Sequence, residues 1–169
     1  MSVIFVILGF VLICLILVHV NLHQKKNELY KFIKKVYKTL MIRHKKISKI
    51  LMLISESEQT KELKELNENT LKLIEKDELS PSQRVRVEVL IEDKMNSLIK
   101  SLELKTLSDD LKAAIESYKK TQTRVNKNKT KYNEMIQEFL EACNIKPAAW
   151  YTAFEKIDTD YPRLLAQSE

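Results

Sequence analysis

Residues 3–20 read VIFVILGFVLICLILVHV, an unbroken apolar run that contains no formally charged side chain. At a rise of 1.5 Å per residue, a helix over this run is about 27 Å long, close to the thickness of the hydrocarbon core of a bilayer. No basic residue precedes the run and no small-residue cleavage site follows it, which distinguishes it from a secretory signal peptide. The run therefore predicts an uncleaved transmembrane anchor over residues 1–21.

Positive charge is concentrated directly after this anchor. Residues 21–50 hold ten lysines and arginines against one acid, whereas the whole chain has a net charge of +6. Because basic flanks stay in the cytoplasm, we expect a single-pass protein of the inner or plasma membrane, with its N-terminus outside and the remainder cytoplasmic. Basic side chains near the bilayer also attract anionic headgroups. We assign this membrane-surface role to Lys25, Lys26, Lys31, Lys34, Lys35 and Lys38.

A basic block is also compatible with binding to nucleic acid, which is the less favoured interpretation. Tyr30, Phe32 and Tyr37 are the aromatic residues of the block, and their spacing fits a helical stripe better than a platform for stacked bases. We therefore expect a membrane surface and an unidentified protein as partners, and no nucleic acid.

Residues 22–144 show the spacing of amphipathic helices, with no competing strand pattern. A long first helix is expected from near Asn21 to near Ile54. Later starts are indicated by a capping box at Ser55 and Glu58, by Ser80 with Pro81, and by residues 106–110. These signals predict an all-α fold, in which the anchor is followed by an antiparallel up-down-up-down four-helix bundle. The expected apolar faces comprise Ile33, Val36, Leu40, Ile47, Ile50 and Ile54; Leu63, Leu66, Leu71 and Ile74; Val87, Ile91, Met95, Leu98 and Leu102; and Leu111, Ile115, Tyr118, Val125, Tyr132, Ile136, Phe139 and Cys143.

Residues 145–169 form a third region, predicted to be a short amphipathic helix and a tail. Trp150, Tyr151 and Phe154 share one side of that helix. Trp and Tyr favour the interface between membrane and water, so these aromatic side chains are expected to lie near the headgroups. An equally supported alternative is that they cap the open end of the bundle.

Residues 124–139, RVNKNKTKYNEMIQEF, resemble the last long helix of the LemA family of bacterial membrane proteins. That family carries two Tyr-Asn pairs seven residues apart, preceded by Arg and followed by Ile and Phe-Pro. Arg124, Asn126, Tyr132, Asn133, Ile136 and Phe139 match this pattern, whereas Val125 replaces the first Tyr and Leu140 replaces the Pro. The resemblance implies an anchored cytoplasmic helical bundle without established enzymatic activity. The motif residues are assigned a structural role, with the two amides fixing helix register.

Catalytic chemistry has little support in the residue pattern. One glycine and two cysteines exclude a glycine-rich phosphate loop and a structural zinc site. Arg43, Gln122 and Lys129 are the polar breaks in the long apolar faces, and His44 is expected to be solvated. No inward set of acids or histidines is expected, so we predict no catalysis, cofactor or metal and favour a structural or protein-interaction module. The alternatives are a sensor whose ligand sits in the bundle and, less favoured, a polybasic binder of nucleic acid or anionic lipid.

Overall fold

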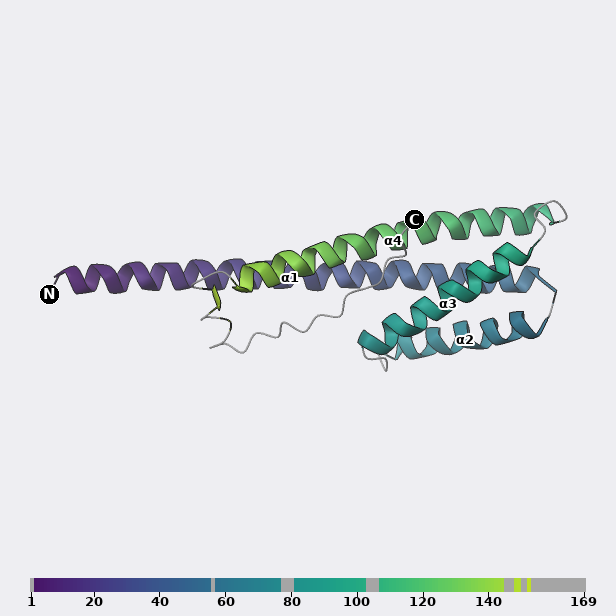
Figure 1. The fold of residues 1–169 in the computed structure, drawn as a ribbon, viewed down its shortest axis with the longest axis horizontal. Helices are drawn as coiled ribbons and strands as arrows, with labels where there is room; N and C mark the ends of the chain where they lie inside the picture. The colour runs from purple at the N-terminus through teal and green to yellow at the C-terminus, as the bar shows by residue number, and fades with distance from the viewer. Residues whose placement is uncertain are drawn as a thin grey trace. The chain divides into compact units, whose positions relative to one another are not determined.

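The computed structural model describes residues 2–55, 57–76, 81–102, 107–144, 148–149 and 152. Its long elements are all helices (Figure 1): α1 (Ser2–Leu53), α2 (Glu58–Glu75), α3 (Pro81–Ser101) and α4 (Asp109–Asn144). The described residues contain no strand. The all-α class and the four predicted helical segments are therefore confirmed.

The chain divides into two compact units. The first contains described residues from 2–35 and 131–152, and the second contains those from 36–130. Helices α1 and α4 each run through both units. We call the first part unit 1 and the second part unit 2.

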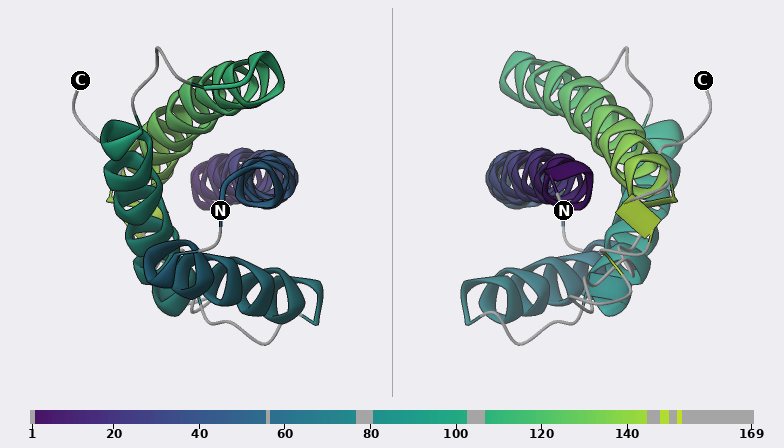
Figure 2. Two further views of the ribbon diagram at one scale, coloured as in Figure 1. Left: turned by 90° about the vertical axis from the view of Figure 1, so that its right-hand side faces the viewer. Right: turned by 90° about the vertical axis from the view of Figure 1, so that its left-hand side faces the viewer.

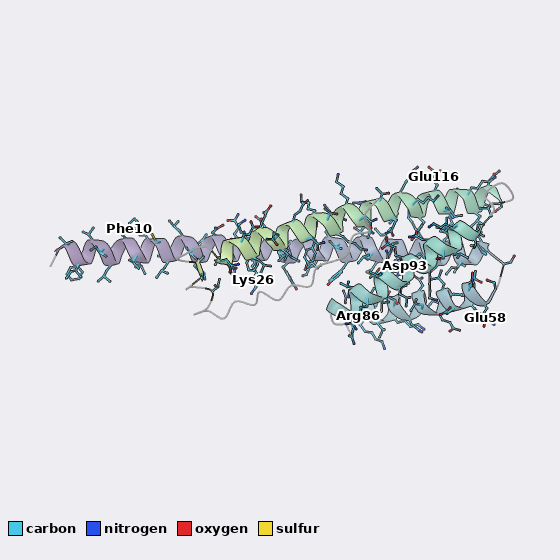
Figure 3. The ribbon with its side chains drawn as sticks, viewed as in Figure 1. Phe10, Lys26, Glu58, Arg86, Asp93 and Glu116 are labelled. Atoms are coloured by element: carbon cyan, nitrogen blue, oxygen red, sulfur yellow. The ribbon has the colours of Figure 1, made fainter. Side chains whose placement is uncertain are left out.

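The first part of α1 is apolar and exposed. Val3, Phe5 and Phe10 expose about two thirds of their surface, at 69%, 69% and 67%. Phe10 projects from the helix in Figure 3. Among the described residues, α1 is the one helix long and apolar enough to cross a membrane, and none of its most apolar window is buried. A core helix of a soluble protein would instead bury such residues.

A small apolar cluster lies within unit 1. Leu22 on α1 packs with Phe139 and Cys143 on α4 and with Ala148, and Val18 lies against their edge. Lys25 on α1 also approaches Glu138 on α4, with Nζ and Oε2 3.9 Å apart. The cluster gives the apolar faces of both helices a buried partner within this unit.

Unit 2 has a core to which all four helices contribute. It contains Ile47, Ile50 and Leu51 of α1, Leu63 of α2, Ile91, Met95 and Leu98 of α3, and Leu111, Ala114, Ile115 and Tyr118 of α4. The part of α1 in this unit contacts each of the other three helices, and the end-on views of Figure 2 show α2 and α3 beside it. Buried positions confirm most of the apolar faces predicted for the first, third and fourth helices, whereas Ile33, Ile54, Val87 and Leu102 are half-buried.

The apolar face predicted for the second helix is only partly correct. Leu63 is buried, but Leu66, Leu71 and Ile74 are half-buried. Thr60, Asn67 and Thr70 are buried instead. The face turned toward the core is therefore more polar than its leucine spacing suggested. Leu63 joins the apolar core, whereas Asn67 bonds to His44 and Ser48 of α1.

The start of α2 lies two residues later than the predicted capping box. Ser57, not Ser55, is the N-cap residue. Its Oγ accepts a hydrogen bond from the backbone N–H of Thr60 at 3.3 Å, and Thr60 Oγ1 accepts one from the N–H of Ser57 at 2.8 Å. A threonine hydroxyl thus fills the reciprocal role that Glu or Gln usually has in this motif.

Candidate functional site

Arg43 is completely buried in unit 2, and its guanidinium joins two carboxylates of α3. Its Nη2 donates to Glu88 Oε2, and its Nη1 lies 3.4 Å from Glu92 Oε2. Because the two glutamates are one helical turn apart, a single guanidinium reaches both of them. Burial lowers the pKa of Arg43, an effect opposed by Tyr118 and Glu92. A guanidinium nevertheless stays charged in proteins, so this position needs buried anionic partners.

Two residues of α4 complete the surroundings of Glu92. Gln122 Oε1 accepts a hydrogen bond from Arg43 Nη1 at 3.1 Å, and Gln122 Nε2 donates to Glu92 Oε1. Lys129 Nζ donates to Glu92 Oε2 at 3.0 Å. Burial lowers the pKa of Lys129, and the charge of Glu92 acts in the opposite direction. Glu92 therefore accepts from three side chains, two of which are cationic.

His44 links this group of residues to α2. Its Nε2 lies 2.9 Å from Glu88 Oε1, and its Nδ1 lies 2.7 Å from Asn67 Oδ1. Asn67 also donates to the backbone oxygen of His44 and to Ser48 Oγ. Burial, followed by the positive charge of Arg43, lowers the pKa of His44 to about 4. The imidazole is therefore neutral at pH 7 and can donate to only one of its two acceptors at a time.

We call Arg43, His44, Asn67, Glu88, Glu92, Gln122 and Lys129 the core ion network. Two basic side chains, Arg43 and Lys129, face two acidic ones, Glu88 and Glu92, so the formal charges of the network balance while His44 is uncharged. Each carboxylate already accepts from cationic or neutral donors of the chain itself. Such an arrangement stabilises one register of α1, α3 and α4, because a shift of any of these helices along its axis would leave a buried charge unpaired.

Tyr118 lies beside the network without joining it. Its side chain is buried, and burial raises its pKa to about 12, so the phenol stays protonated. Among the described residues, its hydroxyl has no hydrogen-bond partner. The ring packs into the apolar core of unit 2. Tyr118 therefore contributes packing rather than polar pairing.

The composition of the network corrects two expectations. His44 was expected to be solvated, but it has no exposed surface. No inward-facing acids were expected, but Glu88 and Glu92 are both buried between the helices of unit 2. Arg43 and Lys129 are buried and Gln122 is half-buried, as expected of polar breaks in apolar faces. The glutamates had a detectable signal, because a buried arginine requires a facing carboxylate and both lie near the apolar face of the third helix.

The residues of the LemA-like motif differ in their surroundings. Tyr132, Ile136 and Phe139 are buried, Asn126 and Asn133 are half-buried, and Arg124 is exposed. Asn126 Oδ1 accepts a hydrogen bond from Gln122 Nε2 at 3.1 Å, which connects the motif to the core ion network within α4. The described residues include no metal-binding group of three or more His, Cys, Asp or Glu side chains.

The basic residues assigned to the membrane surface are accessible. Lys26, Lys31, Lys34, Lys35 and Lys38 are exposed, and Lys25 is half-buried. Lys34 Nζ lies 4.3 Å from the centre of the Tyr30 ring. Trp150, Tyr151 and Phe154, assigned to the membrane interface, lie outside the described residues.

Comparison of the chain with protein-family models, with curated proteins and with solved structures gives no match. The interpretation of the core ion network therefore depends on its own geometry and charge.

Proposed function

We propose that this chain is a membrane-anchored helical scaffold that presents a cytoplasmic surface to a protein partner. The observation that carries the proposal is the contrast along α1, whose first part is apolar and exposed while its later part is buried among α2, α3 and α4. Exposed apolar surface of this extent is costly in water and favourable in lipid. The LemA resemblance supports the same architecture, an anchor followed by an antiparallel bundle.

The proposed topology places the N-terminus outside and the helices from α2 onward in the cytoplasm of the inner or plasma membrane. The charge distribution supports it, because residues 1–20 have no charged side chain and residues 21–50 have a strong positive excess. The alternative of a sensor with a ligand in its core is favoured by one observation, the presence of buried ionisable groups. We rank it second because both buried carboxylates, Glu88 and Glu92, already pair with side chains of the chain itself.

Membrane extraction and protease accessibility test this proposal. The full-length protein should remain in the membrane fraction at alkaline pH, and protease added to sealed cells should leave α2–α4 intact. Leu12→Lys should release much of the protein, because a lysine near the bilayer centre costs about 2.5–3.5 kcal/mol. The matched variant Leu12→Ala should remain in the membrane. Recovery of the unaltered chain in the aqueous fraction, or digestion of its bulk from outside, would overturn the proposal.

A further inference from the structure

In unit 2, basic residues outnumber acidic ones along α1 and α4. Residues 36–53 of α1 contain no acid, and residues 109–130 of α4 contain Asp109 and Asp110 at the start of the helix and Glu116 further on. Glu116 pairs with its own neighbour Lys120 at 2.7 Å and is labelled on α4 in Figure 3. The basic residues Arg43 and Lys129 are neutralised inside the core, but most of the others are exposed.

Two contacts show how these helices run beside each other in unit 2. Lys46 Nζ on α1 donates to the backbone oxygen of Ser117 on α4 at 3.1 Å, and Asn128 Nδ2 donates to Thr39 Oγ1 at 3.2 Å. Later residues of α1 therefore lie opposite earlier residues of α4, so the two helices are antiparallel here. Arg124 is seven residues after Ser117, which places it on the same face of α4, next to the line of contact.

Exposed cations border this line of contact from both helices. Lys38, Ile42, Lys45 and Lys49 follow steps of four and three along α1 and share one face. Arg124 and Lys127 lie on the adjoining face of α4, and both are exposed. We call these six residues the basic face. In the described part of the chain, none of its cations has an acidic partner within salt-bridge distance.

An apolar residue interrupts the charges of the basic face. Ile42 is 46% exposed, with Lys38 and Lys45 on either side of it along the helix. An isoleucine among lysines matches a partner surface that alternates apolar and acidic residues, as one side of an amphipathic acidic helix does. The basic face has no aromatic residue for stacking bases, so single-stranded nucleic acid has less to bind there.

We propose that the basic face binds an amphipathic acidic helix of a partner protein. The inference rests on the proposed function, because it specifies which kind of protein the anchored scaffold would bind. Acidic side chains of the partner would pair with Lys45, Lys49 and Arg124, and an apolar side chain would cover Ile42. Charge complementarity would supply specificity and fast association, and the single apolar contact would set the register.

Binding of a defined peptide to the full-length protein tests this surface. The protein is reconstituted in phosphatidylcholine nanodiscs, and its co-elution with the discs is checked first. The probe is a fluorescent synthetic helix with leucine on one face and glutamate on the others, followed by anisotropy. A protein that does not enter the discs contradicts the anchored scaffold, whereas a disc-bound protein that does not bind the peptide contradicts only the basic face.

Two charge variants and one apolar variant locate the binding site. The triple variant K45Q/K49Q/R124Q should weaken peptide binding about tenfold, because each exposed ion pair contributes about twofold. The matched variant K61Q/K64Q/K72Q removes the same charge from exposed positions of α2 and should change binding less than about twofold. Ile42→Ser should weaken binding about threefold, as loss of a partly exposed apolar contact would.

Other outcomes reject the proposal. An equal loss in the α2 variant would show attraction to net charge rather than a defined face. Tighter binding of an RNA duplex than of the peptide, together with no effect of Ile42→Ser, would assign the face to nucleic acid. Loss of peptide binding when phosphatidylserine is added to the discs would assign it to the membrane surface.

Discussion

Substitution of Arg43 by methionine would test whether the core ion network is a single balanced unit. Methionine keeps much of the length and apolar volume of arginine but has no charge. In the Arg43→Met variant, Glu88 retains only His44 as a donor, and Glu92 retains Gln122 and Lys129. Within the core ion network, the variant therefore keeps two acidic side chains, Glu88 and Glu92, against one basic side chain, Lys129.

The expected cost follows from the burial of both carboxylates. Glu88 and Glu92 are 3% and 2% exposed, so water cannot replace the missing guanidinium. Removing one partner of a buried ion pair destabilises proteins by about 3–5 kcal/mol. For a domain of the size of unit 2, each kcal/mol lowers the midpoint of thermal unfolding by about 4 °C or more. The midpoint should therefore fall by at least about 12 °C.

Two further variants separate charge imbalance from loss of packing. Arg43→Met with Glu88→Met removes one charge of each sign and leaves the pair between Glu92 and Lys129. Replacing a buried ion pair by apolar residues is often neutral or stabilising, so this double variant should recover most of the lost stability. Tyr118→Phe removes a buried hydroxyl without a partner and should change stability little or increase it slightly.

The assay is thermal unfolding of the full-length protein in detergent micelles, followed by circular dichroism at a helix-sensitive wavelength. A loss below about 1 kcal/mol in Arg43→Met would show that the carboxylates are solvated or protonated in the folded protein. A double variant as unstable as the single one would show that arginine acts through packing. Either result would refute the idea that charge balance holds unit 2 together.

Three smaller perturbations test other parts of the structure, the first two by the same unfolding assay and the third by amide hydrogen exchange. Because the folded-state pKa of His44 is about 4, below its ordinary value of about 6.5, the unfolded chain binds a proton first as pH falls. The free energy of unfolding should therefore decrease between about pH 6.5 and pH 4, and His44 should account for about 3 kcal/mol of that decrease at most. The His44→Gln variant should lack this contribution. The same pH dependence in the variant and in the unaltered protein would contradict a buried neutral ring. Ser57→Ala should cost about 1 kcal/mol, because the N–H of Thr60 loses its acceptor, whereas Ser55→Ala should cost almost nothing. Phe139→Ala should destabilise unit 1 by about 3–5 kcal/mol, measured by amide hydrogen exchange at the C-terminal end of α4, and fast exchange there in the unaltered protein would argue against its packing on Leu22.

Helix positions were predictable because each helix carries its own local signals. Pro81 begins α3, Ser108 Oγ accepts a hydrogen bond from the N–H of Leu111 at the start of α4, and apolar spacing identifies the buried faces of three helices. The exact start of α2 was less predictable. Residues 55–58 offer two overlapping serine caps, and a hydroxyl three residues after Ser57 decides between them.

The core ion network was harder to predict because its contacts join residues that are far apart in the sequence. Glu88 and Glu92 lie one helical turn apart beside the apolar face of α3, and only the position of Arg43 on another helix shows that they turn inward together. In the sequence, His44 lies between the basic residues Arg43 and Lys45. In the structure, the rotation of the helix between residues 43 and 44 directs its ring toward Asn67 on α2. Pairings across helices depend on how the helices pack, and residue spacing within one helix does not report that packing.

The shared use of each carboxylate also limits how the chain can change over evolutionary time. Glu92 pairs with Arg43, Gln122 and Lys129 together, so no single replacement of a charged member by an uncharged residue preserves the balance of charge. Drift at these positions would have to pass through paired exchanges, or through an intermediate with much lower folding stability. Descendants of this sequence should therefore carry the charged set in full or have lost it in matched pairs.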